Sequence, residues 1–214
     1  MPPALQTAID PDELASLKAQ WGPLASRYHT LTVDEPFLTG QNQLLTSDGR
    51  RAEICYVMHR GNPAEEVLLH IKTFYPSGAY RLPTGGVQTG ETVMATLSRE
   101  IEEETGLIVG AGADQVCVER CLGIVVYDMA HRRAARTFSF ATYHFLVAMP
   151  RDGVLAPRDA EEQIAGWQWR AADELTDVAD YLEQVGKQAP DWADWGRYRS
   201  LSHRFVAAML SRLP

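Results

Sequence analysis

Four glutamates lie close together near the middle of the chain, at position 100 and at positions 102 to 104. On a helix, Glu100, Glu103 and Glu104 fall within a sector of about 100°, whereas Glu102 points elsewhere. Three carboxylates on one helix face repel one another by roughly a few tenths of a kcal/mol per pair. A hard divalent cation relieves this repulsion, because Mg²⁺ prefers the oxygens of carboxylates, phosphates and water. The spacing of these acids therefore predicts a metal site.

Glycines precede the acidic stretch. Gly85, Gly86 and Gly90 form a flexible segment in which the backbone can approach a metal or a phosphate closely. A solvated face is the common explanation for a glutamate-rich helix, and the adjoining glycines favour a metal or phosphate site instead. Arg99 lies one helical turn before Glu103 and is placed to orient that carboxylate.

The acids need a helix and a sheet to position them. A helix is predicted from Thr92 to Thr105, with Gly106 as its C-terminal glycine. Met94, Leu97 and Ile101 occupy the sector next to the acids and should pack on a sheet. Strands are predicted at residues 52–59, 67–72, 116–127, 137–148 and 164–169, and further helices at 10–21, 171–185 and 192–210. Residues 34–52 are rich in turn formers, with a hairpin expected at Asp48-Gly49.

Strands around one central helix, with more helices at both ends, predict an α/β layered fold with a mixed sheet. We divide the chain into an N-terminal helical extension (1–40), a central domain (41–175) and a C-terminal helical extension (176–214). The last extension carries an aromatic stripe that should pack on the domain or on a partner subunit, so a homodimer is a hypothesis.

The composition limits the class of protein. The 214 residues have a formal net charge of -8, with 45% hydrophobic and 22% charged residues, which is typical of a globular domain. An acidic chain argues against a nucleic-acid-binding protein, which normally has a basic face. The N-terminus does not resemble a signal peptide, and no apolar run is long enough to span a membrane. We therefore expect a cytoplasmic protein with reduced cysteines at Cys55, Cys117 and Cys121.

The acidic stretch and its glycines together resemble the complete Nudix box. That motif is a glycine, five residues, a glutamate, seven residues, and then Arg-Glu-aliphatic-any-Glu-Glu-any-Gly-aliphatic. Its defined positions are occupied by Gly85, Glu91, Arg99, Glu100, Ile101, Glu103, Glu104, Gly106 and Leu107. A chance match in a chain of this length has a probability of roughly one in ten million.

The resemblance to the Nudix family implies a Nudix-type α/β/α sandwich with a mixed β-sheet, here with extra N- and C-terminal helices. It also implies that Glu100, Glu103 and Glu104 bind Mg²⁺ or Mn²⁺, with Glu91 close by and Arg99 supporting the carboxylates. The implied reaction is attack of water on a pyrophosphate linkage in a nucleoside diphosphate joined to another group. The expected partner is thus a small phosphorylated nucleotide.

Two kinds of residue stay open within this resemblance. The general base is either Glu103, which we favour, or Glu161 or Glu162 in the loop before a late strand. Arg81, Gly85, Gly86, Arg132 and Arg136 are the candidate substrate-binding residues, because phosphates need cations and close backbone approach. The candidates for stacking a base are Trp167, Trp169 and Tyr127, although strand aromatics more often pack in a core.

The substrate is left open. ADP-ribose, nucleotide sugars, dinucleoside polyphosphates and nucleoside triphosphates are all candidates, and no pattern resembles the coenzyme A or NADH subfamilies. The proline that marks many ADP-ribose hydrolases is replaced by Leu122-Gly123. The alternative to an enzyme is a non-catalytic metabolite sensor or regulator on the same fold. An isomerase of the isopentenyl diphosphate type is a weaker alternative, because such enzymes have an extra cysteine and a variant box.

Overall fold

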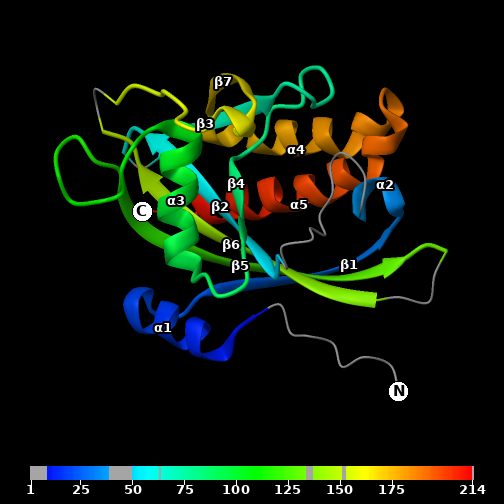
Figure 1. Ribbon diagram of the computed structural model, residues 1–214, viewed down its shortest axis with the longest axis horizontal. Helices are drawn as coiled ribbons and strands as arrows, with labels where there is room; N and C mark the ends of the chain where they lie inside the picture. Colours follow the sequence, from blue (N-terminus) through cyan, green and yellow to red (C-terminus); the bar gives the residue numbers. More distant parts are fainter. Residues whose placement is uncertain (1–8, 39–49, 63, 134–136, 151–152, 214) are drawn as a thin grey trace.

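One mixed sheet of seven strands forms the centre of the molecule (Figure 1). The computed structural model describes the chain except residues 1–8, 39–49, 63, 134–136, 151–152 and 214. The strand order is β1-β5-β6-β2-β3-β7, and β4 pairs with β2. The pairs β1–β5 and β2–β6 are parallel and the others are antiparallel. The strands are β1 (Ala25–Val33), β2 (Ala52–Arg60), β3 (Glu66–Lys72), β4 (Thr84–Val87), β5 (Cys117–His131), β6 (Thr137–Ala148) and β7 (Ile164–Ala171).

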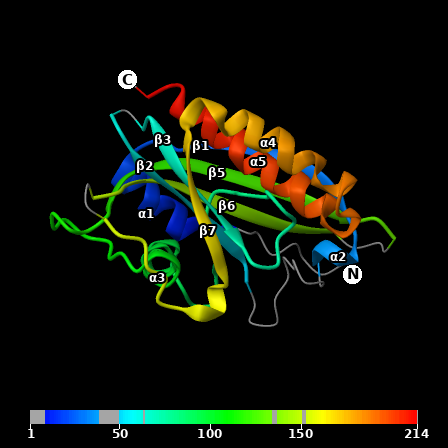
Figure 2. The same cartoon turned by 90° about the horizontal axis from the view of Figure 1, so that it is seen from above.

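Helices cover both faces of this sheet (Figure 2). The longer helices are α1 (Pro11–Trp21), α3 (Val93–Thr105), α4 (Leu175–Gln184) and α5 (Ala193–Leu210), and α2 (Glu35–Leu38) is a single turn. Side chains of α1 and α3 share one buried core with the sheet, and side chains of α4 and α5 share another. The predicted α/β layers, the mixed sheet and the terminal helices are therefore confirmed.

The helix that carries the acids, α3, begins and ends where the sequence predicts. The Thr92 hydroxyl accepts a hydrogen bond from the Ala95 amide at 3.1 Å and caps the first turn. Gly106 ends the helix with a φ of 77°, a left-handed conformation that favours glycine. Leu97 and Ile101 are fully buried. One face of α3 is thus fixed on the sheet, and the acids occupy the neighbouring sector.

The N-terminal segment corrects one expectation. Residues 1–40 were expected to be helical, yet β1 lies between α1 and α2 and pairs in parallel with β5 at the edge of the sheet. Most of its side chains are polar, and several, such as Arg27 and Thr30, are exposed, so the segment has little of the apolar alternation that predicts a strand. The division of the chain into three parts stays a prediction. The hairpin expected at Asp48-Gly49 lies outside the described residues.

The C-terminal helix α5 packs its aromatic stripe on the sheet of its own chain. Trp195, Tyr198 and Phe205 are buried there, so much of the apolar surface behind the homodimer hypothesis is covered within the monomer. The homodimer itself stays a prediction. In the part of the chain that the structure describes, no helix is long and apolar enough to cross a membrane.

Candidate active site

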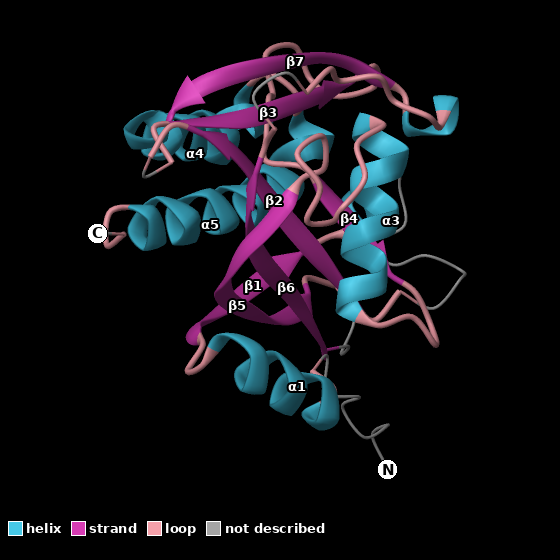
Figure 3. Ribbon diagram, turned by 90° about the vertical axis from the view of Figure 1, so that its left-hand side faces the viewer, coloured by secondary structure: helices cyan, strands magenta, loops and turns pink. Residues whose placement is uncertain are grey.

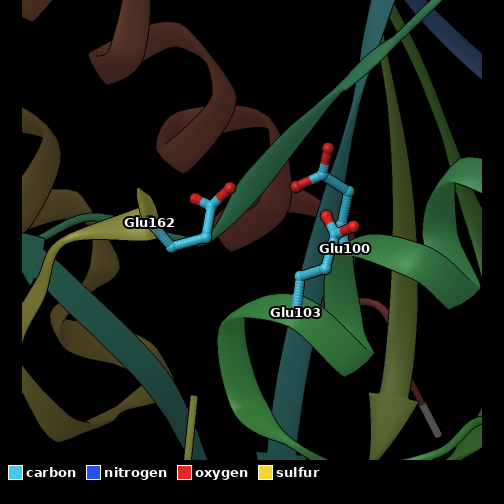
Figure 4. Close-up of side chains that lie close together, drawn as sticks. All are labelled: Glu100, Glu103 and Glu162. Carbon is cyan, nitrogen blue, oxygen red and sulfur yellow. The ribbon is translucent and has the colours of Figure 1, made fainter. Parts of the chain in front are cut away.

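Three carboxylates from two separate elements meet beside α3. Glu100 and Glu103 come from the helix, and Glu162 comes from the 3-10 turn Ala160–Glu162 just before β7 (Figures 3 and 4). Each offers one oxygen, and these oxygens lie within 4.8 Å of one another. Glu100 is 6% exposed, whereas Glu103 and Glu162 are partly exposed. We call these three residues the acid cluster.

Arg99 holds the helical side of the acid cluster. Its Nη1 donates to Glu100 at 2.9 Å and to Glu103 at 2.8 Å. Its Nε donates to Glu91 at 2.8 Å, and its Nη2 donates to the carbonyl of Gly86 at 3.2 Å. One guanidinium therefore fixes three carboxylates and the glycine strand β4 in a single arrangement.

Glu104 lies behind the acid cluster. Its side chain is fully buried, and the hydroxyl of Tyr56 on β2 donates to it. The ammonium of Lys72, at the end of β3, lies 3.1 Å from the Glu104 carboxylate and 2.5 Å from Glu162. Among the described residues, Glu104 is not part of the group of acids that converge closely enough to share an ion.

The two glycines of β4 allow close packing at the site. A Cβ on Gly85 would overlap the carboxylate of Glu100, and a Cβ on Gly86 would overlap the guanidinium of Arg50. Because Gly85 and Gly86 have no side chains, an acid and a cation can lie directly against the backbone of β4 at these two positions.

The environment shifts the pKa values of these acids in opposite directions. Burial, and then the charge of Glu104, raises the pKa of Glu100 to about 8. Burial also raises the pKa of Glu104, against the opposing charge of Lys72. Burial alone would raise the pKa of Glu162, but the charge and hydrogen bond of Lys72 outweigh it, so the net pKa is lowered.

The donor set fits a hard divalent cation. All three members of the acid cluster are carboxylates, which Mg²⁺ and Mn²⁺ prefer. The raised pKa of Glu100 shows that its negative charge lacks enough compensation in the protein alone. Glu100, Glu103 and Glu162 are thus the residues that could hold a metal ion, and Glu104 would support them from behind.

The arginines that were expected to bind the substrate and that the structure describes lie away from the acid cluster or form other contacts. Arg81 is 3% exposed and donates to Tyr75, Thr84 and the carbonyl of Leu82, so it supports the segment before β4. Arg132 is half exposed and forms ion pairs with Asp34 and Asp194 rather than with the acids. Arg136 lies outside the described residues.

Sequence reasoning missed three residues near the box: Lys72 and Tyr56, which contact Glu104, and Arg50, which lies against Gly86 on the opposite face of β4. Lys72 had one available signal, because it ends a predicted strand as the only charged residue after an apolar run. Tyr56 and Arg50 had none, because their closeness to the box arises from the pairing of β2 with β4.

The remaining candidates separate by burial. Glu161 is exposed beside Glu162, and it is not a member of the acid cluster. Tyr127 is fully buried on the α5 side, where its hydroxyl lies 3.2 Å from Ser202, so it is not available to stack a base. Trp167 and Trp169 are partly buried on the α3 side.

Comparison with known proteins identifies the family of this chain. Among solved structures, the E. coli dihydroneopterin triphosphate pyrophosphohydrolase is similar over 62% of this chain and 86% of that protein, with 19% identity and a TM-score of 0.44. No curated protein matches the chain. Residues 49–195, well over half of the chain, match the NUDIX domain family. The protein therefore belongs to the Nudix family, and its class, a hydrolase of pyrophosphate bonds, is the one that the sequence predicted.

Proposed function

We propose that this protein hydrolyses a phosphoanhydride bond in a nucleoside diphosphate linked to another group, with Mg²⁺ or Mn²⁺ as cofactor. The observation that carries the proposal is the acid cluster, in which carboxylates from α3 and from the loop before β7 converge beside the glycines of β4. A divalent ion bound there would neutralise the charge of the phosphate oxygens and make hydroxide easier to form from water.

The protein residues prepare this site in a defined way. Arg99 holds Glu100 and Glu103 in fixed orientations, so the acids do not have to reorganise when a substrate binds. Arg50 lies against Gly86 on the face of β4 opposite Glu100, and its charge helps to lower the pKa of Glu53. Arg81, which was expected to bind phosphate, acts instead by holding the segment before β4.

Glu103 remains our candidate for the general base, and Glu162 is the alternative. Arg99 engages only one oxygen of Glu103, and the Glu103 side chain is 32% exposed, which leaves room for a water molecule. Glu162 is 21% exposed and already bonded to Lys72. A base must be reachable by the water that it deprotonates, and this favours Glu103.

The test is a screen of the purified protein with Mg²⁺ or Mn²⁺ against ADP-ribose, nucleotide sugars, dinucleoside polyphosphates and nucleoside triphosphates. Release of nucleotide or phosphate is the readout. We expect Glu103→Gln and Glu104→Gln each to lower the rate by at least about 100-fold, the scale of losing a catalytic or metal-supporting carboxylate. Full activity in both variants would refute the mechanism.

A metabolite sensor is the competing function. It predicts tight binding of one of these compounds with no turnover in the presence of either metal. The intact set of acids favours the enzyme. A cytoplasmic location belongs to the same proposal, since the expected substrates are cytoplasmic metabolites.

A further inference from the structure

Lys72 occupies an unusual position between two acids that come from different elements. It is the last residue of β3, and its side chain is 13% exposed. Its ammonium lies 2.5 Å from Glu162 in the loop before β7 and 3.1 Å from Glu104 on α3. Lys72 therefore links the Glu162 turn to the buried side of the helix, whereas Arg158 of the same loop forms an exposed ion pair with Glu102 on the outer side of α3.

Glu162 needs such a link more than the helical acids do. Glu100, Glu103 and Glu104 are fixed on α3, whose apolar face is buried in the core. Glu162 lies instead on a single 3-10 turn, flanked by Gln163 with a positive φ of 53°. The backbone of this loop is bonded to α3, because the amides of Arg158 and Asp159 donate to the carbonyl of Glu103. What needs a further contact is therefore the side chain of Glu162, which is longer and freer than the turn that carries it.

Charge repulsion would push Glu162 out of the site. One of its oxygens lies within 4.8 Å of oxygens of Glu100 and Glu103, so it is repelled by each of these acids that is ionised. A charge-assisted hydrogen bond from Lys72 opposes this repulsion at the point where it is greatest.

The backbone around Lys72 points to the same role. The pairing of β3 with β7 shifts register between Ile71 and Lys72, because Ala165 is an extra residue on β7, and Lys72 pairs with Ile164, two residues after Glu162. The next residue, Thr73, continues the link, because its amide donates to the carbonyl of Gln163 at 2.9 Å. The end of β3 is thus fastened to the Glu162 turn by both backbone and side chain.

From these contacts we infer that Lys72 is a positioning residue that holds Glu162 against α3 and so completes the acid cluster. The inference rests on the proposed function, since it assigns the acid cluster to metal binding. Lys72 acts through Glu162 and Glu104 rather than by touching the reacting atoms.

A purely electrostatic role makes the opposite prediction. If Lys72 only added positive charge near the acids, its removal would strengthen the binding of a divalent cation, because like charges repel. If it positions Glu162, its removal weakens metal binding, since one ligand is no longer held in place. The sign of the change separates the two roles.

The experiment is a calorimetric titration of metal-free protein with Mn²⁺, comparing wild type with Lys72→Met and Glu162→Gln. We expect Lys72→Met to raise the Kd for Mn²⁺ by about tenfold or more, the effect typical of residues that orient metal ligands. The double variant Lys72→Met/Glu162→Gln should bind Mn²⁺ no more weakly than Glu162→Gln alone, since both changes disable the same ligand. Unchanged or tighter binding by Lys72→Met would overturn the inference.

Two controls separate positioning from general damage. Lys187→Met removes an exposed lysine that bonds only to Gln184 among the described residues, and it should leave the Kd unchanged. Lys72→Met leaves the buried Glu104 without its cation, which destabilises a fold. If that variant does not fold, Lys72→Met/Glu104→Gln is compared with Glu104→Gln, because the pair of neutral residues removes the uncompensated charge.

Hydrogen exchange in the metal-free protein provides a readout that does not depend on activity. Amides of residues 160–163 should exchange about tenfold faster in Lys72→Met than in wild type, because the turn loses its side-chain contact with β3. The amides of Arg158 and Asp159, which donate to the carbonyl of Glu103, should be unchanged. Equal exchange would count against positioning. If wild type binds no Mn²⁺ and hydrolyses no substrate, the proposed function fails, and exchange still decides whether Lys72 holds the turn.

Discussion

Two groups of charged residues lie on opposite sides of the sheet, one partly exposed and one buried, and they differ in their balance of charge. On the α3 side are the acid cluster and Glu104. On the α5 side, Glu53 of β2 is 1% exposed, and its Oε1 accepts hydrogen bonds from Arg199 at 2.7 Å, Tyr198 at 2.8 Å and Thr142 at 3.0 Å. We call these four residues the Glu53 cluster.

The pKa values reflect this difference in charge balance. Burial alone would raise the pKa of Glu53, but the charge of Arg199 and the hydrogen bond from Tyr198, with smaller contributions, lower it overall. Burial also raises the pKa of Glu100, and the negative charge of the nearby Glu104 adds to this effect, so that the pKa is about 8. The negative charge of a buried acid such as Glu53 is neutralised by a cation of the protein itself. An acid such as Glu100, whose charge is neutralised less completely, is suited to binding a metal ion.

The Glu53 cluster also supports the site from behind. Glu53 is the register partner of Gly86, so the cluster fixes β2 next to the glycine strand. On the same helix as Arg199, the Nε2 of His203 accepts a hydrogen bond from the Leu82 amide at 2.9 Å, just before β4. The α5 helix therefore holds the strand on which the acids pack.

The largest expected effect on stability follows from breaking the Glu53 cluster. Glu53→Gln leaves the buried Arg199 without its counter-charge, and we expect a loss of about 3–5 kcal/mol in the free energy of unfolding. Denaturant unfolding measures this loss. The rate per folded molecule should stay within a few fold of wild type, because the acid cluster is intact. A stable Glu53→Gln protein with no activity would reverse the roles assigned to the two clusters.

Metal binding should stabilise the protein through the acid cluster alone. At a free Mn²⁺ concentration 100 times the Kd, wild type should gain about 2.7 kcal/mol relative to protein in a chelator. Glu53→Gln should keep this gain, whereas Glu103→Gln should lose most of it. Thermal unfolding with and without Mn²⁺ tests both. An equal gain in Glu103→Gln would place the metal elsewhere.

The pH dependence of stability should have opposite signs for the two clusters. Because the pKa of Glu100 is raised in the folded state, its contribution to stability is present at low pH and is lost as pH rises through about 8. The lowered pKa of Glu53 makes its contribution present at neutral pH and lost as pH falls. In metal-free protein, the free energy of unfolding of wild type should therefore fall relative to that of Glu100→Gln as the pH rises from about 5 to about 8. Denaturant unfolding of both proteins at intervals of about one pH unit measures this difference. A constant difference across this range would contradict the raised pKa.

The sequence predicted the parts of this molecule that depend on local pattern. The bounds of α3 follow from the cap at Thr92 and the glycine at Gly106. The closeness of Glu100 and Glu103 follows from helical periodicity. The strands β2, β3, β5, β6 and β7 and the terminal helices followed from the pattern of apolar residues, whereas β1 and β4 were not predicted. In each case the residues that decide the structure are neighbours along the chain.

The remaining parts depend on contacts between distant residues, which one sequence does not contain. Lys72 and Glu162 are 90 positions apart, and Glu53 and Arg199 are 146 apart. Glu104 shares the helix sector of Glu100, but Tyr56 and Lys72 hold it away from the acid cluster. The strand β1 was missed because its polar side chains gain their place from pairing with β5 rather than from burial.

The smallest expected effect comes from Glu102, whose side chain is the most exposed of the four glutamates on α3. Its side chain is 44% exposed and pairs with the exposed Arg158. Exposed pairs of this kind contribute at most about 1 kcal/mol, so Glu102→Gln should change stability by less than that and leave the rate nearly unchanged. The matched comparison is Glu103→Gln, the same substitution one residue later. Because both variants replace a glutamate by a glutamine and so remove the same charge, any difference in their steady-state rates is due to the position of the glutamate on α3. Equal losses of rate in both would mean that the total negative charge of α3, rather than the geometry of the acid cluster, supports activity.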